Sequence, residues 1–149
     1  MKKKINKIQK ADLKRGAENE EKVYNWLRDH NIPAIQKMDD KYHVFDFKSD
    51  DYLFELKSRN YNHNRFNDWI FGINKIKHLV KNNIDKAYFY FLFEDGLYRW
   101  RYKKNGFTVR RMGRKDRGKV EMAKCVCVKT VDLEFVTNDI INEEVCMIK

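Results

Sequence analysis

Residues 46–57 read Asp-Phe-Lys-Ser-Asp-Asp-Tyr-Leu-Phe-Glu-Leu-Lys, and this segment indicates both a local fold and a chemistry. Apolar and polar residues alternate on each side of the polar break at residues 49–51, which predicts two strands joined as a β-hairpin. Because side chains alternate between the two faces of a strand, Glu55 and Lys57 should point to one face. We expect Asp46 to lie across the hairpin, close enough to share a divalent ion with Glu55.

The residue types in this hairpin suit a magnesium site. Mg²⁺ prefers oxygen ligands, usually takes one or two protein carboxylates and leaves its other positions to water and substrate phosphate. Asp46 and Glu55 are therefore the predicted ligands, and we expect Mn²⁺ to be able to replace Mg²⁺. Lys57 could orient or deprotonate an attacking water, or neutralise charge in the transition state. The alternative is a half-exposed hairpin with charged residues on its solvent face, which is common in antiparallel sheets.

A helix is predicted over residues 15–30, where Val23, Tyr24 and Leu27 form one apolar stripe. Glu20 lies in the middle of that stripe. A carboxylate on the core side of a helix needs a cation or strong donors, because burying it unpaired is costly. Two interpretations follow: Glu20 forms a buried salt bridge or a cap, or it is a further acid directed at the metal site.

A second helix is predicted after a polar loop at residues 60–67, where apolar residues recur at helical spacing: Ile73, Ile76, Leu79 and Val80. This helix carries Lys75 and Lys77, and either could face the acidic residues. The alternative is that both are ordinary exposed lysines of an amphipathic helix.

Taken together, these features resemble the PD-(D/E)XK nuclease superfamily, over roughly residues 15–100. The order is a glycine, Gly16, then a helix glutamate, a hairpin with Asp followed by Glu-x-Lys-Ser, and a helix with a polar residue four before a leucine. This layout is most similar to the archaeal Holliday junction resolvase branch. Phe45 stands where the superfamily often has a proline. The resemblance implies a catalytic set of Glu20, Asp46, Glu55, Lys57 and Lys75, of which Asp46, Glu55 and Glu20 would contact the metal.

The resemblance also implies an overall architecture and an activity. The expected fold is α/β, a restriction-endonuclease-like mixed central sheet flanked by helices. The expected activity is magnesium-dependent hydrolysis of phosphodiester bonds, by an endonuclease acting on duplex or branched DNA. A small chain of this type would need a second copy to cut both strands, which suggests a homodimer. Two alternatives remain: a nucleic-acid-binding module that keeps the fold without cutting, and a nuclease that cleaves RNA.

Composition favours a polyanionic partner. The chain of 149 residues has a formal charge of +10, which favours nucleic acid or anionic membrane surfaces over acidic proteins or neutral metabolites. A basic segment at residues 1–14 is interpreted as a flexible tail that still assists binding. A glycine-containing loop between strands is the predicted phosphate-binding region, with Arg110, Arg111, Arg114, Lys115, Arg117 and Lys119. No apolar run reaches the roughly 18 residues that span a bilayer, so we expect an intracellular protein without a membrane partner.

The second half of the chain predicts a C-terminal antiparallel extension within the same single domain, residues 1–149. Residues 86–94, 97–102, 107–112 and 120–136 have strand character, and turns at Asp95-Gly96 and Asn105-Gly106 predict a meander. On one face of this meander, Tyr98, Trp100 and Tyr102 either pack in the core or stack on nucleobases. We expect Cys125, Cys127 and Cys146 to be reduced thiols.

Overall fold

The computed structural model describes residues 7–30, 32–38, 44–116 and 119–141, without the side chains of residues 7–9, 12–13, 114–116 and 119–122. Within these ranges the protein is a mixed α/β structure in which a six-stranded mixed sheet faces a three-stranded antiparallel sheet. Three helical segments accompany the sheets: α1 (Lys7–His30), α2 (Asn74–Lys81) and the 3₁₀ helix η1 (Thr130–Asp132).

The larger sheet has the strand order β1-β2-β3-β5-β6-β9. Its strands are β1 (Gln36–Lys37), β2 (Phe47–Lys48), β3 (Leu53–Ser58), β5 (Ala87–Phe93), β6 (Gly96–Arg101) and β9 (Glu134–Thr137). β3 and β5 are parallel, and every other neighbouring pair is antiparallel. The β2–β3 pair, with Phe47 opposite Phe54, confirms the hairpin that the sequence predicts.

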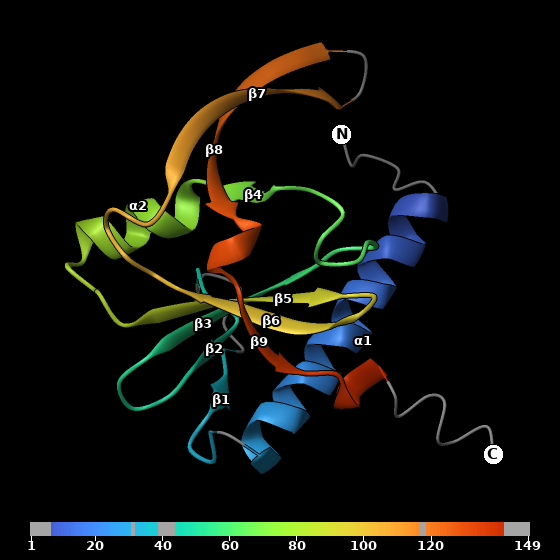
Figure 1. The fold of residues 1–149 in the computed structure, drawn as a ribbon, viewed down its shortest axis with the longest axis vertical. Helices are drawn as coiled ribbons and strands as arrows, with labels where there is room; N and C mark the ends of the chain where they lie inside the picture. Colours follow the sequence, from blue (N-terminus) through green and yellow to red (C-terminus); the bar gives the residue numbers. More distant parts are fainter. Residues whose placement is uncertain (1–6, 31, 39–43, 117–118, 142–149) are drawn as a thin grey trace, which may run out of the picture.

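The two faces of the larger sheet are covered by different elements (Figure 1). On one face, α1 packs Val23 and Leu27 against Phe54 and Tyr90. On the other face, the buried residues Ile76 and Leu79 of α2 share a core cluster with β5. The second sheet completes this cover, in the order β4 (Asp68–Gly72), β8 (Lys119–Lys129), β7 (Thr108–Asp116).

Strand β5 is apolar throughout because it is buried on both faces. Phe89, Phe91 and Phe93 belong to the cluster under α2, whereas Tyr90 and Leu92 belong to the cluster under α1. A strand enclosed in this way does not show the alternation of a half-exposed strand. The order of the sheet therefore places β3 beside the most deeply buried strand of the protein.

The helices differ from the sequence prediction in their limits and faces. α1 begins at Lys7, so residues 7–14 are helical where a flexible tail was expected, and residues 1–6 lie outside the described residues. Val80 is 63% exposed and does not belong to the buried face of α2. Strand β4, between the polar loop and α2, was not predicted, because a short apolar run before a helix resembles the start of that helix.

The predicted meander is only partly correct. Asp95-Gly96 forms the β5–β6 hairpin, where Gly96 has a φ of 154° that side chains rarely adopt. Asn105-Gly106 also forms a local turn, in which the Gly106 N–H donates to the Lys103 carbonyl at 3.0 Å. However, this turn joins two different sheets, because β7 pairs with β8 and not with β6. A turn signal fixes the local backbone and leaves the pairing partner open.

The predicted basic loop is instead part of a long β7–β8 hairpin, which extends away from the body of the protein (Figure 1). The backbones of Arg114, Lys115 and Lys119 lie in these strands, but their side chains are not described, and Arg117 lies outside the described residues. The charged run was interpreted as a loop because glycines interrupt it. The pairing of residues 108–116 with residues 119–127 overrides that local signal.

Other sequence interpretations concern the core. Trp100 and Tyr102 are buried in the cluster beneath α2 and the second sheet, which confirms the packing alternative for these two rings. Cys125 and Cys127 are buried free thiols as expected, and Cys146 lies outside the described residues. Among the helices that the structure describes, none has the length and apolar character needed to cross a bilayer.

Candidate active site

Strand β3 carries two charged residues on the face that elsewhere forms the core. Leu56 and Phe54 point toward α1, so Glu55 and Lys57 point to the opposite face, as the alternation predicts. Glu55 is only 3% exposed, whereas Lys57 is partly exposed near the end of the strand. The polar pair therefore runs from the buried interior toward solvent.

Asp46 is held against β3 by the backbone. It directly precedes β2, and its N–H donates to the carbonyl of Phe54 at 3.1 Å. In return, the Leu56 N–H donates to Asp46 Oδ2 at 2.9 Å. Because Leu56 lies between Glu55 and Lys57, this bond fixes the Asp46 carboxylate beside both. The sequence prediction that Asp46 and Glu55 come together across the hairpin is consistent with this arrangement.

Helix α1 brings Glu20 to the same place. Glu20 is half-buried and lines the pocket with Gly16 and Ala17, one turn earlier on the helix. The helix is tied to the end of β3 by Asn19, whose Nδ2 donates to Ser58 Oγ at 3.3 Å. Glu20 thus combines its place on the apolar stripe with a position facing the hairpin acids.

Helix α2 contributes Lys75. Its Nζ lies 2.7 Å from Glu55 Oε2 and 5.7 Å from the centre of the Phe45 ring. Although this ion pair is close, Oε2 accepts no hydrogen bond of ordinary geometry from the described residues. Lys77 is exposed and does not line the pocket, so the structure brings Lys75 rather than Lys77 to the acids.

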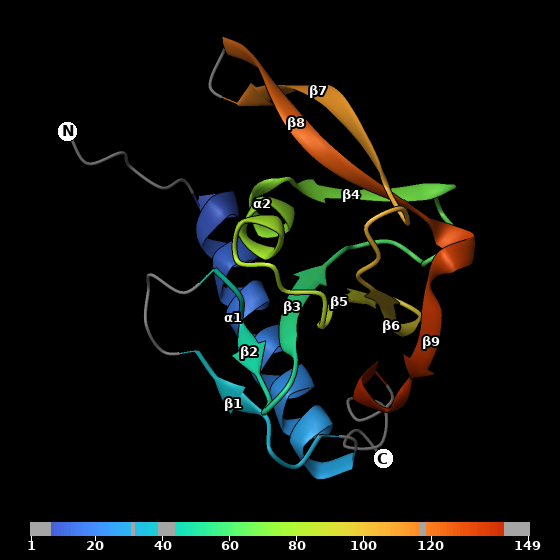
Figure 2. The ribbon, with the colours of Figure 1, turned by 90° about the vertical axis from the view of Figure 1, so that its left-hand side faces the viewer.

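These elements enclose a pocket of about 800 Å³. Figure 2 shows α1, β3 and α2 close to one another, and residues of all three line this pocket. The pocket is lined by Arg15, Gly16, Ala17, Glu20, Asp46, Glu55, Leu56, Lys57, Ser58, Arg59, Asn60 and Lys75. All five predicted catalytic residues are in this set.

Sequence reasoning missed Arg59. Its guanidinium donates to the carbonyl of Ile70 at 2.9 Å and to that of Ser58 at 3.0 Å, which fixes the side chain at the pocket wall. The signal was present in the sequence, because Arg59 continues the period of two set by Glu55 and Lys57. A third charged residue in this series extends the polar face beyond the end of β3.

Burial and close neighbours shift the pKa values of the site. Burial, followed by hydrogen bonding to Asp46 and repulsion from it, raises the pKa of Glu55 to about 8, although Lys57 and Lys75 oppose this shift. Burial and the Asp46 charge also raise the pKa of Glu20, against the attraction of Lys37. Such shifts concentrate at functional sites.

Lys57 is shifted in the opposite sense. Burial lowers its pKa, and the nearby positive charges of Lys75 and Arg59 add to this effect, while Glu55 and Asp46 oppose it. A lysine with a lowered pKa is a better proton acceptor at neutral pH than an ordinary one. The pocket therefore combines two carboxyl groups whose pKa is raised, Glu55 and Glu20, with a lysine whose pKa is lowered.

The donor set fits a hard divalent cation. The buried carboxyl group of Glu55 lies beside a second carboxylate, Asp46, and its Oε2 contacts Lys75 Nζ at 2.7 Å, so a cation already lies against this oxygen. In the part of the chain that the structure describes, no three acidic, histidine or cysteine side chains form a ready metal-binding group. Two protein carboxylates with water and phosphate completing the shell are the pattern expected for Mg²⁺.

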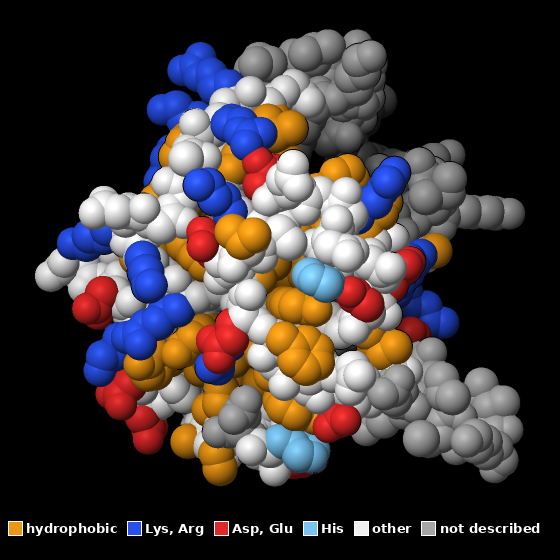
Figure 3. Space-filling model, viewed as in Figure 1, with side chains coloured by type: hydrophobic (Ala, Val, Ile, Leu, Met, Phe, Trp, Pro, Cys, Tyr) orange, Lys and Arg blue, Asp and Glu red, His pale blue; other side chains and the backbone are white. Residues whose placement is uncertain are grey.

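The predicted nucleic-acid surface is described only at its start. Arg110 and Arg111 are exposed on β7, and Arg110 forms an ion pair with Asp68 of β4. Figure 3 shows Lys and Arg side chains gathered over the side of the molecule formed by β7 and α2. The surface next to the second sheet is therefore basic where its side chains are described.

Comparison of the chain with protein-family models, with characterised proteins and with solved structures gives no match.

Proposed function

We propose that the protein is a metal-dependent deoxyribonuclease of the PD-(D/E)XK type, an endonuclease that hydrolyses phosphodiester bonds in duplex or branched DNA. One observation supports this most strongly. Residues from three separate elements, spread over more than fifty positions of the chain, meet in one solvent-accessible pocket as acids and lysines. The restriction-endonuclease-like fold belongs to this proposal, and the mixed sheet with helices on both faces is compatible with it.

In this proposal Asp46 and Glu55 hold the metal ion, and Glu20 acts from the α1 side of the pocket. The metal, when bound, supplies an activated water and stabilises charge on the phosphoryl oxygens. Asp46 is already oriented for this role by the Leu56 N–H. Metal binding requires an ionised Glu55, so the proton favoured by its raised pKa has to leave.

The lysines have separate roles. Lys57, with its lowered pKa, orients the attacking water or accepts its proton. Lys75 contacts Glu55 at 2.7 Å in the free protein, and it would be available to the substrate phosphate if Glu55 held a cation instead. Arg59, in the wall of the same pocket, adds positive charge for a phosphate.

The basic surface holds the substrate in this proposal. Arg110 and Arg111 lie on the β7–β8 hairpin, and the backbones of Arg114, Lys115 and Lys119 lie further along it. Contacts of this kind position the phosphate backbone without reading the bases. Because one pocket cuts one strand, cleavage of both strands of a duplex requires two copies of the protein acting together.

The test is cleavage of end-labelled DNA by the purified protein with Mg²⁺ or Mn²⁺, on duplex, single-stranded, flap and four-way substrates, with RNA alongside. Asp46→Asn and Lys57→Gln are compared with Asp50→Asn, a matched exposed carboxylate on the β2–β3 turn. We expect wild type and Asp50→Asn to cut in a metal-dependent manner. The two pocket variants should lose about a hundredfold or more of the rate while still binding DNA.

A second candidate is a nucleic-acid-binding module that does not cut. The Lys75–Glu55 ion pair favours it, since a buried acid with its own cation can be a purely structural feature. The same experiment separates the two. Tight binding by wild type, with no cleavage of any substrate under either metal, would replace the nuclease with the binding module. Cleavage that survives in Lys57→Gln would contradict the assigned site.

A further inference from the structure

A second pocket, next to the candidate active site, is lined by aromatic side chains. Its volume is about 410 Å³. It lies between the loop at residues 60–67 and the strands β4 and β7, and its walls are Arg59, Tyr61, Phe66, Asp68, Trp69, Ile70, Arg110 and Met112. In the sequence this loop is a mostly polar segment, and its two aromatic residues, Tyr61 and Phe66, belong to none of the predicted motifs.

Two rings in this pocket are exposed. Tyr61 is 46% exposed and Phe66 is 44% exposed, although large aromatic side chains gain free energy by burial. Of the three rings that the sequence offers for base stacking, Trp100 and Tyr102 lie in the core, and Tyr98 is partly buried against it with its ring stacked on His63. Exposed aromatic rings clustered in a pocket are typical of a binding site.

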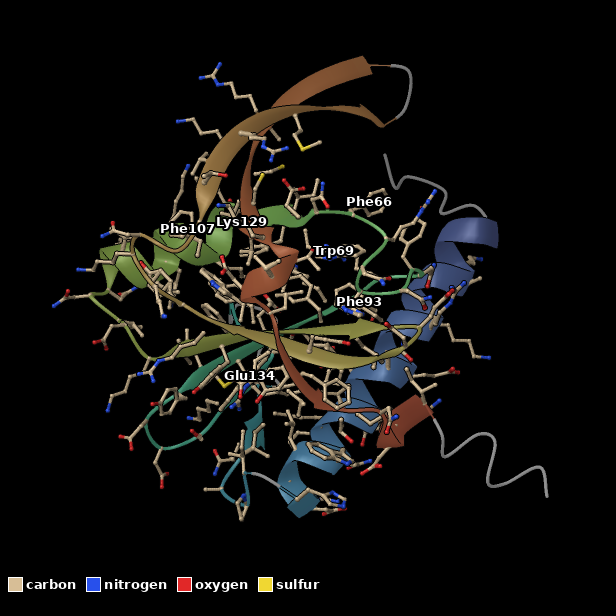
Figure 4. All side chains as sticks on the ribbon, viewed as in Figure 1. Phe66, Trp69, Phe93, Phe107, Lys129 and Glu134 are labelled. Atoms are coloured by element: carbon tan, nitrogen blue, oxygen red, sulfur yellow. The ribbon has the colours of Figure 1, made fainter. Side chains whose placement is uncertain are left out.

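The pocket is rigid on one side. Trp69 is buried, packs 4.5 Å from Phe93 and donates its Nε1–H to the His63 carbonyl at 2.9 Å. Phe66 contacts Trp69 edge-to-face at 5.4 Å, so the rings form a column from the loop down to β5 (Figure 4). The platform is therefore fixed before any ligand binds.

The exposed pair is arranged to leave ring surface free. Tyr61 and Phe66 meet edge-to-face, with centres 5.2 Å apart and planes at 76°. In such a pair, the ring that presents its edge keeps both faces clear of that contact. A planar ligand can therefore stack on a ring face that this contact leaves clear, although one face of Phe66 already carries the Arg65 guanidinium.

The surroundings of the pocket are cationic. Arg65 lies 5.6 Å over the Phe66 ring, and Arg59 and Arg110 form part of the wall. Asp68, paired with Arg110, places one acceptor at the same wall. A planar group attached to negative charge matches this combination of rings and cations, and a nucleotide is such a group.

Position links this pocket to the chemistry. Arg59 lines both the aromatic pocket and the acidic pocket, so the two share a wall at the end of β3. A nucleic acid strand that places a phosphate over Asp46 and Glu55 can therefore continue past Arg59 toward the aromatic rings. A base stacked within a continuous duplex cannot enter such a pocket without leaving its stack, which costs a few kcal/mol.

We infer that the aromatic pocket receives an unpaired nucleobase next to the cleaved bond, so that the substrate class is DNA with an unpaired nucleotide at the cutting site, such as a flap or branch. This inference rests on the proposed nuclease function. The base stacks against Tyr61 and Phe66 over the Trp69 platform, and Arg59 lies between it and the scissile phosphate.

The test compares the affinities of wild type and variants for three DNA substrates under conditions in which the DNA is not cut. Affinities are measured by fluorescence anisotropy, with Ca²⁺ replacing Mg²⁺, for a paired duplex, a flap duplex, and the same flap with abasic nucleotides at the junction. The double variant Tyr61→Ala/Phe66→Ala is compared with wild type and with Phe135→Ala, a matched exposed ring that lies outside the pocket. Tyr61→Phe keeps the ring and serves as the conservative variant.

We expect wild type to bind the flap roughly tenfold more tightly than either the abasic flap or the paired duplex. The double variant should lose about that factor on the flap and nothing on the other two substrates, while Phe135→Ala and Tyr61→Phe bind like wild type. An adenine analogue such as 2-aminopurine at the junction should also lose fluorescence when wild type binds, which reports stacking without any variant.

Other results would overturn the inference. Equal affinity of wild type for the flap and the abasic flap, or an equal loss by the double variant on all three substrates, would mean that no base enters the pocket. If the expected affinity differences are seen but no substrate is cleaved, the proposed nuclease activity is wrong and the base-binding role of the pocket is kept. If metal-dependent cleavage is seen without these affinity differences, only the base-binding role of the pocket is wrong.

Discussion

Strands β3 and β5 lie side by side in parallel, yet they use the same face of the sheet in opposite ways. Glu55 of β3 is the register partner of Phe89, and Lys57 is the partner of Phe91. Both phenylalanines are fully buried in the core, whereas the charged pair opens into the pocket. On this face of the sheet, β3 thus has charged side chains at the positions where the neighbouring strand β5 has buried phenylalanines.

The difference has an energetic consequence. Burying an aromatic ring stabilises the fold, whereas burying a carboxyl group disfavours its ionised form, as the raised pKa of Glu55 shows. Proteins retain such unfavourable groups where function requires them. β5 therefore serves stability, and β3 accepts a stability cost for the proposed chemistry.

The largest expected effect comes from a substitution on β5, the strand that stabilises the core. Phe89→Ala removes a fully buried ring that packs 4.6 Å from Phe71 and 5.5 Å from Trp100. We expect the free energy of unfolding to fall by about 3–5 kcal/mol, measured by urea denaturation. Val131→Ala, at an exposed apolar position, should change it by less than about 0.5 kcal/mol. A small effect of Phe89→Ala would mean that the core repacks.

The register partner on β3 should behave in the opposite way. Glu55→Gln keeps the shape of the side chain and removes its charge, so we expect cleavage to slow by roughly a hundredfold to a thousandfold, about 3–4 kcal/mol. Thermal unfolding of the same variant should occur at or above the wild-type temperature, since a buried carboxyl is replaced by a neutral group. A variant that is both inactive and clearly less stable would contradict the division of roles between the strands.

The pH dependence of stability sharpens this point. The folded pKa of Glu55 is raised from 4.5 to about 8, so between these values the folded protein keeps a proton that the unfolded chain has lost. The protonated Glu55 side chain therefore contributes fully to the free energy of unfolding below pH 4.5. This contribution is lost as the pH rises to about 8 and the buried carboxyl group ionises. The stability advantage of Glu55→Gln over wild type should grow by about 3–4 kcal/mol from pH 5 to pH 8, because each pH unit between the two pKa values changes the free energy of unfolding by about 1.4 kcal/mol. Urea denaturation in a chelator at three pH values measures this, and a constant difference would contradict it.

The smallest effect concerns the two lysines of α2. Lys75 contacts Glu55 at 2.7 Å, and Lys77 is exposed outside the pocket. We expect Lys75→Gln to reduce the cleavage rate about tenfold, as removal of one charge-assisted contact does, while Lys77→Gln leaves the rate unchanged. Steady-state kinetics on a flap substrate compares them. Equal losses in both variants would indicate that α2 acts only through its general positive charge.

Much of the candidate site follows from local patterns. The alternation of β3 places Glu55 and Lys57 on one face, and helical periodicity places Glu20 on the inner side of α1. Local periodicity reports the direction of a side chain relative to its own element. It could not distinguish Lys75 from Lys77, because that depends on how α2 packs on the sheet.

The errors have a related cause. The turn at Asn105-Gly106 was identified, but the pairing of β7 with β8 depends on contacts between distant residues. Similarly, the sequence leaves packing and base stacking open for Trp100 and Tyr102, and only the elements that cover these rings decide for packing. Tertiary context of this kind overrides local strand signals.

The sequence by itself determined the types of most elements, the β2–β3 hairpin, the shared face of the acid and lysine on β3, and the positive charge of the chain. Only the tertiary structure decided which lysine meets Glu55, that Arg59 joins two pockets, and that the exposed aromatic rings lie beside the acids. The physical reason is the distance along the chain over which each effect acts. Backbone geometry fixes side-chain direction within a few residues, whereas packing between elements distant in the chain determines which side chains meet.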